Sequence, residues 1–454
     1  MTLKSCNAAG NIRRFGSTAG FCAIALAATS LSASAQTGMK PPTVNTGDTA
    51  WMLISAALVM LMTPGLALFY GGMVRSKNIL NMLMQSFVAL GIVTIVWVLW
   101  GYSLAFAPAN PFIGGLQWMG LMHVGGAPSP LYAPTIPHQL YMIYQMMFAI
   151  ITPALISGAI AERMKFSAYC LFMVLWCTIV YCPIAHWVWG SDGWLNKLGA
   201  LDFAGGTVVH ISSGVSALVL VLMLGTRSAS GTLAEEELRP HNLPMTLTGT
   251  ALLWFGWFGF NAGSALTSSS LAVSAFCTTH VAAAAAGLTW ILIEWVKFKK
   301  PSALGFATGA VAGLVAITPA SGFVSIGAAI IIGICVSFIS FNAIKLKSIL
   351  KFDDALDVFG VHGVGGMFGA IATGLFASTA INVAGANGLF EGGGTALVLK
   401  QLAAVGSTVA FAAFGTFIIV KVLQLTIGIR VSTDEESAGL DVSLHSEEAY
   451  AMAD

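Results

Sequence analysis

Long uncharged stretches, broken by short charged ones, run along most of the chain. The longest covers residues 78–161, which contain no Asp, Glu, Lys or Arg. A helix that crosses a membrane needs about 20 predominantly apolar residues. Dividing the stretches on that basis, with breaks at clusters of Pro, Gly and Ser, predicts eleven spans. One span each is expected in 49–74, 166–191, 203–226, 358–390 and 401–420, and two each in 78–161, 240–293 and 301–344.

The charged residues between these spans predict the orientation of the chain. An odd number of spans puts the two termini on opposite sides of the membrane. Lys and Arg collect in cytoplasmic loops. With the N-terminus outside, the inner loops carry most of the basic residues, including Arg163 and Lys347, and the outer side carries Lys40, Lys197 and Lys400. The pattern therefore predicts an N-terminus outside and a C-terminus inside.

Composition excludes several classes of protein. Only 9% of residues are charged, whereas a soluble domain carries about 25%. The hydrophobic set makes up 57%, the mean hydropathy is +0.83, and a net charge of +1 leaves no basic surplus for nucleic acid. These values exclude a soluble enzyme, a disordered chain and a nucleic-acid binder, and favour an all-α membrane protein. The cysteines form no C-x-x-C pair, so neither a metal site nor a cofactor is expected.

The two ends of the chain differ from the apolar middle. Residues 1–35 combine basic residues, a short apolar run and the signal Ala33-Ser34-Ala35, which predicts a signal peptide cleaved near Ala35. A short first transmembrane helix is the alternative. We expect a periplasmic segment over 36–48, a membrane domain over 49–425 and a cytoplasmic tail over 426–454. The acidic tail is either a solvated end or a regulatory contact.

An internal repeat predicts where the centre of the molecule lies. Asp202 precedes His210 by eight residues, and Asp354 precedes His362 by eight residues. The first pair falls in the fifth expected span and the second in the tenth, which run in opposite directions. Five spans followed by five of opposite direction, here with an extra eleventh, form the inverted-repeat plan of many transporters. Substrate sites in that plan lie near the membrane midplane, at the interface of the repeats.

These residues are candidates for chemistry within the membrane. Ionisable side chains at bilayer depth are rare and usually face the bundle interior or a pathway. The repeat brings His210 and His362 together, where two imidazoles share one proton. Two separately hydrogen-bonded core histidines are the alternative. Asp202 is expected mainly to cap its helix, with an electrostatic contribution toward a cation, and Asp354 and Asp357 are its expected inner counterparts.

Aromatic residues around Ser264 form a second candidate site. Phe148 lies early in the third expected span, Trp189 just past the outer end of the fourth, and Phe260 in the sixth. A cage of such rings with a hydroxyl acceptor binds a small cation by cation–π contact. Ordinary packing and an interfacial aromatic belt are the alternative interpretation, and spacing alone does not choose between them.

Several stretches of the chain resemble the ammonium transporter family (the Amt/Mep/Rh group), most closely its bacterial Amt branch. The similarity runs from near residue 50 into the tail. It includes PGLALFYGGMVRSKN at 64–78, ALDFAGGTVVHISSG at 200–214, DDALDVFGVHGVGG at 353–366 and GLDVSLHSEEAY at 439–450. The resemblance implies a homotrimer with eleven spans and one narrow pore in each subunit. The bacterial-type signal peptide indicates a bacterial inner membrane.

The resemblance also implies roles for the aromatic residues. Trp189, Phe148 and Ser264 match the outer site that recruits ammonium in this family. Phe148 and Phe260 match the stacked gate below that site.

Further roles follow from the same resemblance. His210 and His362 match the twin histidines of the pore, and Asp202 matches the family aspartate needed for transport. Thr318 matches a threonine of the pore wall. Tyr144 departs from the family pattern, in which a Phe faces the outer vestibule, and its hydroxyl is expected to add an acceptor for the cation.

The expected function is selective transport of ammonium or ammonia, with deprotonation at the outer site, NH₃ in a hydrophobic pore and net transfer of charge. The resemblance implies control by a PII-type signalling protein at the cytoplasmic face. An ammonium sensor is an alternative, which the tail of 29 residues disfavours. A Rh-like conductor of neutral gases is another, which the combination of Trp189, Ser264 and Phe148 disfavours. An enzyme is not expected, because no nucleophile–base set or nucleotide loop appears.

Overall fold

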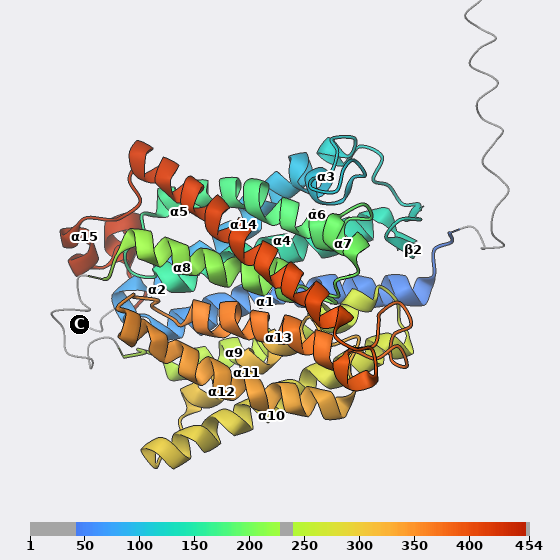
Figure 1. Cartoon of the computed structure of the whole chain (residues 1–454). Coiled ribbons are helices and arrows are strands. Elements are labelled where there is room, and N and C mark those ends of the chain that lie inside the picture. Colours follow the sequence, from blue (N-terminus) through green and yellow to red (C-terminus); the bar gives the residue numbers. More distant parts are fainter. Residues whose placement is uncertain (1–41, 228–238, 451–454) are drawn as a thin grey trace, which may run out of the picture. The chain divides into compact units, whose positions relative to one another are not determined.

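The computed structural model describes residues 42–227 and 239–450, which form a bundle of helices (Figure 1). The expected signal peptide over 1–35 lies outside the described residues, as does the first part of the expected 36–48 segment. The α-helices are α1 (Thr46–Met73), α2 (Ile79–Val96), α3 (Tyr102–Phe106), α4 (His138–Ile160), α5 (Phe166–Trp176), α6 (Cys182–Trp189), α7 (Trp194–Leu198), α8 (Ser212–Leu224), α9 (Leu243–Ala262), α10 (Ser270–Phe298), α11 (Ala303–Ile317), α12 (Ile326–Leu350), α13 (Val364–Phe376), α14 (Ala396–Thr426) and α15 (Thr433–Ala438).

Shorter elements connect or interrupt these helices. Wider π-helical turns are η2 (Trp97–Gly101), η4 (Cys177–Tyr181), η5 (Gly206–Ile211), η9 (Phe359–Gly363) and η11 (Asp441–His445). Single 3₁₀ turns are η1 (Ser76–Asn78), η3 (Met119–Leu121), η8 (Gly263–Ala265) and η10 (Leu389–Glu391). Strands β1 (Pro128–Ser129) and β2 (Ala133–Pro137) form one irregular antiparallel pair.

The helices account for the predicted spans. In the described part of the chain, nine segments are long and apolar enough to cross a membrane. Two more helices, α9 with 20 residues and α11 with 15, occupy the stretches where the remaining two spans were expected. Helix α11 is apolar but short, whereas α9 is long enough but contains Thr, Gly and Asn residues that lower its hydropathy. The chain is therefore a predominantly helical, multi-pass membrane protein, and the count of eleven stays a prediction.

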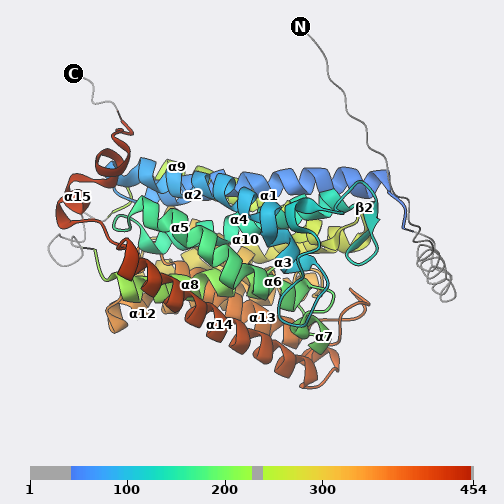
Figure 2. The same cartoon turned by 90° about the horizontal axis from the view of Figure 1, so that it is seen from above.

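The ends of the bundle separate two sets of connecting segments. In both views β2 and α7 lie at one end of the helices, and α15 lies at the other (Figures 1 and 2). The Pro/Gly-rich connection at 108–136 and the C-terminal tail therefore lie at opposite ends of the bundle, and their sides of the membrane stay a prediction.

Helices α1 and α9, the first of each expected repeat, pack against each other along their length. Close approach requires a glycine at the contact, because a Cβ on Gly249 would lie 2.3 Å from the backbone nitrogen of Phe69. The segments that resemble each other in sequence therefore share one central interface.

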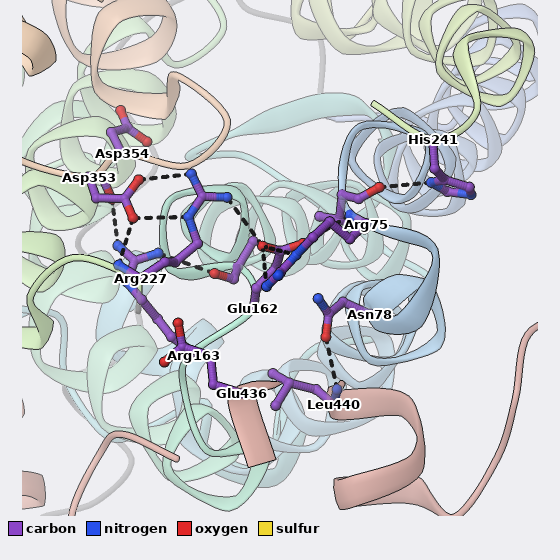
Figure 3. A network of polar contacts seen from close by, with 12 residues as sticks. Arg75, Asn78, Glu162, Arg163, Arg227, His241, Asp353, Asp354, Glu436 and Leu440 are labelled. Atoms are coloured by element: carbon purple, nitrogen blue, oxygen red, sulfur yellow. Dashed lines mark hydrogen bonds and ion pairs between the residues drawn. The ribbon is translucent and has the colours of Figure 1, made fainter. Parts of the chain in front are cut away.

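The C-terminal tail is docked on the helices. The Asp441 carboxylate accepts hydrogen bonds from the backbone N–H groups of Leu80 at 3.0 Å and Asn81 at 2.8 Å, at the start of α2. The backbone N–H of Leu440 donates to the side-chain oxygen of Asn78 at 2.8 Å (Figure 3). The interpretation as a solvated end is therefore wrong for this part of the tail, which makes specific contacts with α2 and the turn before it.

A buried ionic network joins the loops at the same end of the bundle (Figure 3). Glu162 pairs with Arg75 at 3.1 Å and with Arg227 at 3.3 Å, and Arg227 also binds Asp353 at 2.9 Å. Burial by itself raises the pKa of Glu162, but the charges of Arg227 and Arg75 outweigh it, so the pKa lies below its ordinary value. The network fixes the segment that leads into η9 and α13.

Candidate functional site

Two aspartates begin the π-helical turns that carry the candidate histidines. Asp202 accepts hydrogen bonds from the N–H groups four and five residues later, both at 2.7 Å. Asp354 does the same at 3.1 and 2.7 Å. The start of a helix leaves such N–H groups without intrahelical partners, so each carboxylate caps its turn. The equal offsets give both histidines the same local frame, and π-helical turns are frequent at functional sites.

Asp357 lies apart from this capping pattern. Its carboxylate pairs with Nζ of Lys347 at 2.5 Å. Asp354 is 2% exposed, and burial, with the nearby charge of Asp357, raises its pKa to about 6. Burial raises the pKa of Asp357 as well, against the opposing charge of Lys347. The two inner aspartates were expected to act alike, but only Asp354 takes the position that Asp202 has in the first repeat.

The imidazoles of His210 and His362 meet inside the bundle. Their Nδ1 atoms are 3.3 Å apart and their ring centroids 5.3 Å apart. The side chains are only 1% and 4% exposed. The two helices approach so closely at Gly214 that a side chain does not fit there: a Cβ would lie 2.2 Å from the backbone nitrogen of Gly363. The structure therefore brings together two residues that are 152 positions apart in the sequence.

The hydrogen bond between the two Nδ1 atoms determines which ring nitrogens carry protons. One ring donates from Nδ1 and the other accepts there, so when both rings are neutral the second ring carries its proton on Nε2. The pair then presents one Nε2 acceptor and one Nε2–H donor. Nε2 of His210 is buried and has no hydrogen-bond partner among the described residues. A small neutral molecule that both donates and accepts hydrogen bonds fits this arrangement.

The histidines border a narrow apolar cavity. Its other walls come from aliphatic and aromatic side chains such as Leu66, Ile151 and Val311. Apolar walls provide no ligands that replace the hydration shell of an ion.

Trp257 forms one wall of this cavity and orients His210. Its indole ring stacks on the His210 ring, with centroids 5.5 Å apart. The indole N–H donates to Oγ1 of Thr318 at 2.9 Å. Thr318 was expected on the pore wall, but it is not among the residues that line the two cavities around the histidines. Thr318 instead contacts Trp257 through this hydrogen bond and fixes the orientation of the indole ring.

A second cavity lies next to the first. The two share Phe69, Val311 and His362, and the second also reaches Asp357. Since Asp357 lies near the end of the bundle that holds the tail, this cavity lies between the histidines and that end. A route past the histidines thus leads from an apolar space to a charged one.

Two stacked rings close the other end of the histidine cavity. Phe148 of α4 and Phe260 of α9 lie with centroids 4.2 Å apart and an interplanar angle of 28°. Both are 1% exposed. The Phe260 ring is also 6.1 Å from the ring of His210. The stacked pair therefore separates the histidines from the side on which Trp189 and Ser264 lie.

The remaining candidate residues lie around this pair of rings. Trp189, the last residue of α6, lies perpendicular to Phe148 at 5.9 Å, and its indole N–H donates to the Asp202 carbonyl at 3.0 Å. Oγ of Ser264 lies 2.9 Å from the Phe260 carbonyl oxygen, to which it donates. Trp189 and Ser264 are half-buried, so both are reachable from the outer side. Two rings and a hydroxyl oxygen thus surround the approach to the gate.

Comparison with known proteins identifies the family to which this chain belongs. A family model described as the Ammonium Transporter Family matches residues 50–450. The chain belongs to the ammonium transporter family. Among its relatives, an ammonium transporter of Bacillus subtilis (strain 168) is 56% identical over 405 residues, which cover 89% of this chain and 98% of the relative.

Solved structures of the family share the fold of this ammonium transporter homologue. The crystal structure of Candida albicans Mep2 is 39% identical, with a TM-score of 0.81 over 86% of this chain and 88% of that one. A structure described as a Sensor Amt Protein is 29% identical, with a TM-score of 0.80 over 88% of this chain and 98% of that one. The helical bundle is thus the fold of Mep2 and Amt proteins.

The contacts of Trp257 and Tyr144 were not predicted from the sequence. Trp257 stands in the stretch WFGWFGFNAG at 254–263, in which the sequence singled out only Phe260. Its place beside His210 depends on Thr318, which is 61 positions away. Tyr144 was expected to face the outer vestibule, but it is fully buried and its hydroxyl contacts α9. No local pattern signals either contact, because both join segments that are distant in the sequence.

Proposed function

We propose that this member of the family transports ammonium selectively by moving its neutral form through the histidine cavity. NH₄⁺ is recruited by Trp189, Phe148 and Ser264. When the Phe148 and Phe260 rings part, it transfers one proton to the free Nε2 of the histidine pair and continues as NH₃. The observation that supports this proposal is the Nδ1–Nδ1 hydrogen bond of 3.3 Å between two buried imidazoles in an otherwise apolar cavity.

The cavity favours a neutral species on energetic grounds. Moving a bare ion from water into a medium of low dielectric costs on the order of 20 kcal/mol before compensation. K⁺ resembles NH₄⁺ in size and charge, so a cation–π site alone discriminates poorly between them. NH₄⁺ becomes neutral by losing a proton and K⁺ does not, so selectivity arises at the deprotonation step.

The histidine pair gives the neutral molecule its hydrogen bonds. The Nε2 acceptor takes an N–H of NH₃, and the Nε2–H donates to its lone pair. The Nδ1–Nδ1 bond also links the two rings, so a proton that reaches one ring is relayed through the other. Transfer of that proton alongside NH₃ makes net transport electrogenic.

The proposed setting is a homotrimer in a bacterial inner membrane, with Asp202 as a structural and electrostatic support of the outer site. A PII-type signalling protein is the proposed regulator at the face where the tail docks. These partners rest on the resemblance to the family.

Currents from purified protein in liposomes test the proposal. We expect an ammonium pulse to give a current and an equal potassium pulse to give none. Replacing both histidines, His210→Leu with His362→Leu, is expected to abolish the selective ammonium current. An unchanged current in that double variant would refute the histidine mechanism. A rise of internal pH without current would mean that NH₃ passes and the proton stays outside, and absence of any flux would favour a sensor.

A further inference from the structure

Tyr144 contacts both halves of the gate, although the proposed mechanism assigns it no role. It lies one helical turn before Phe148 on α4, and its ring centroid is 5.0 Å from that of Phe148. Its hydroxyl lies 2.9 Å from the carbonyl oxygen of Gly259 and 2.9 Å from that of Phe260. The same hydroxyl is 3.2 Å from Oγ of Ser264.

The two carbonyls belong to the last turn of α9. Carbonyls in that position lack a full set of intrahelical partners and form the negative end of the helix dipole. The Gly259 oxygen accepts the backbone N–H of Gly263, and the Phe260 oxygen accepts the Ser264 hydroxyl at 2.9 Å. The Tyr144 hydroxyl supplies a further donor to this pair of oxygens. Exposed carbonyl oxygens are good ligands for K⁺, because they replace its hydration shell.

Packing around Gly263 keeps the hydroxyl against these carbonyls. A Cβ on Gly263 would lie 2.8 Å from Oη of Tyr144 and 2.9 Å from Oγ of Ser55. Helices α1, α4 and α9 therefore meet at this glycine with no room for a side chain. The carbonyl of Phe260 is nonetheless close to the outer side, since its other partner, Ser264, is half-buried.

We propose that Tyr144 is a specificity-determining residue, whose hydroxyl covers the Gly259 and Phe260 carbonyl oxygens and so denies K⁺ a set of ligands at the gate. The inference rests on the proposed ammonium transport. Each carbonyl oxygen has a second lone pair, which the Tyr144 hydroxyl occupies. A K⁺ ion bound to these lone pairs has no proton to lose, so it does not pass inward as NH₃ does, and it blocks the site for ammonium. Tyr144 acts through the carbonyls and is a positioning residue.

Inhibition of the ammonium current by K⁺ in liposomes tests this role. Tyr144→Phe keeps the ring and removes only the hydroxyl. We expect the K⁺ concentration that halves the current to fall about two- to tenfold, the range that corresponds to one lost hydrogen bond. The matched control is Tyr141→Phe, the same change on the same helix, where the hydroxyl accepts from Gln145 at 3.4 Å. This control is expected to keep the K⁺ sensitivity of the unmodified protein.

The outcomes separate this inference from the proposed function. An ammonium current in Tyr144→Phe with unchanged K⁺ sensitivity overturns the inference, and so does equal sensitisation by Tyr141→Phe. If Tyr144→Phe yields no folded protein, Ser264→Ala uncovers the Phe260 oxygen from the other side and must itself raise K⁺ sensitivity. Absence of ammonium current in the unmodified protein contradicts the proposed transport instead.

Discussion

Replacing Asp202 with Asn separates a structural role of this aspartate from a purely electrostatic one. The carboxylate accepts the N–H groups of Gly205 and Gly206 on one oxygen and that of Thr207 on the other, each at 2.7 Å. The Thr207 hydroxyl donates to the second oxygen as well. Asn keeps the first oxygen but places an NH₂ group where the second oxygen was, facing another N–H donor.

The expected loss follows from these contacts. The N–H of Thr207 loses its charged acceptor, which costs about 1.5–3 kcal/mol, and the Thr207 hydroxyl has to turn and accept from the new NH₂ group instead of donating to a carboxylate. The two bonds that remain lose their charge assistance, and neutral bonds are roughly half as strong. We therefore expect Asp202→Asn to lower the free energy of unfolding by about 3 kcal/mol. Since this cap begins the turn that carries His210, the ammonium current is expected to fall as well.

Unfolding in SDS titrations of mixed micelles, alongside liposome currents, measures both effects. The counterpart Asp354→Asn removes a cap with the same offsets but also relieves a buried charge, so its loss of stability is expected to be smaller. Loss of current in Asp202→Asn with unchanged unfolding would refute the capping argument and leave only an electrostatic role.

Three further predictions follow from single contacts. Gly214→Ala is expected to abolish the ammonium current in liposomes, since its Cβ would lie 2.2 Å from the nitrogen of Gly363, whereas Gly91→Ala, with nothing within 4 Å, is expected to keep it. The raised pKa of Asp354, about 6, makes its ionised form costly. Lowering the pH from 7 to 4 should therefore stabilise the unmodified protein relative to Asp354→Asn by about 2 kcal/mol in SDS titrations, and an equal pH dependence of both would contradict this. Asp441→Asn is expected to speed amide hydrogen exchange in residues 439–446, because the carboxylate that caps α2 is lost; unchanged exchange would mean that the tail is held by other contacts.

The sequence determined the class of protein and the position of its helices. In lipid a helix must satisfy its backbone hydrogen bonds within its own segment, so apolar length and loop charge are local signals that can be read directly. The breaks near 264–270 and 318–322, expected from Ser, Pro and Gly, fall where α9 and α11 end. The Asp-to-His spacing also pointed to two equivalent helix starts, because a cap acts on residues next to it.

Only the tertiary structure decided how these helices meet. The 3.3 Å contact of His210 with His362, the hold of Thr318 on Trp257 and the covering of α9 carbonyls by Tyr144 each join residues at least 61 positions apart. The sequence likewise left the tail open between a solvated end and a contact, until Asp441 was placed at the start of α2. Side-chain approach across helices depends on packing of the whole bundle, which no short window of sequence contains.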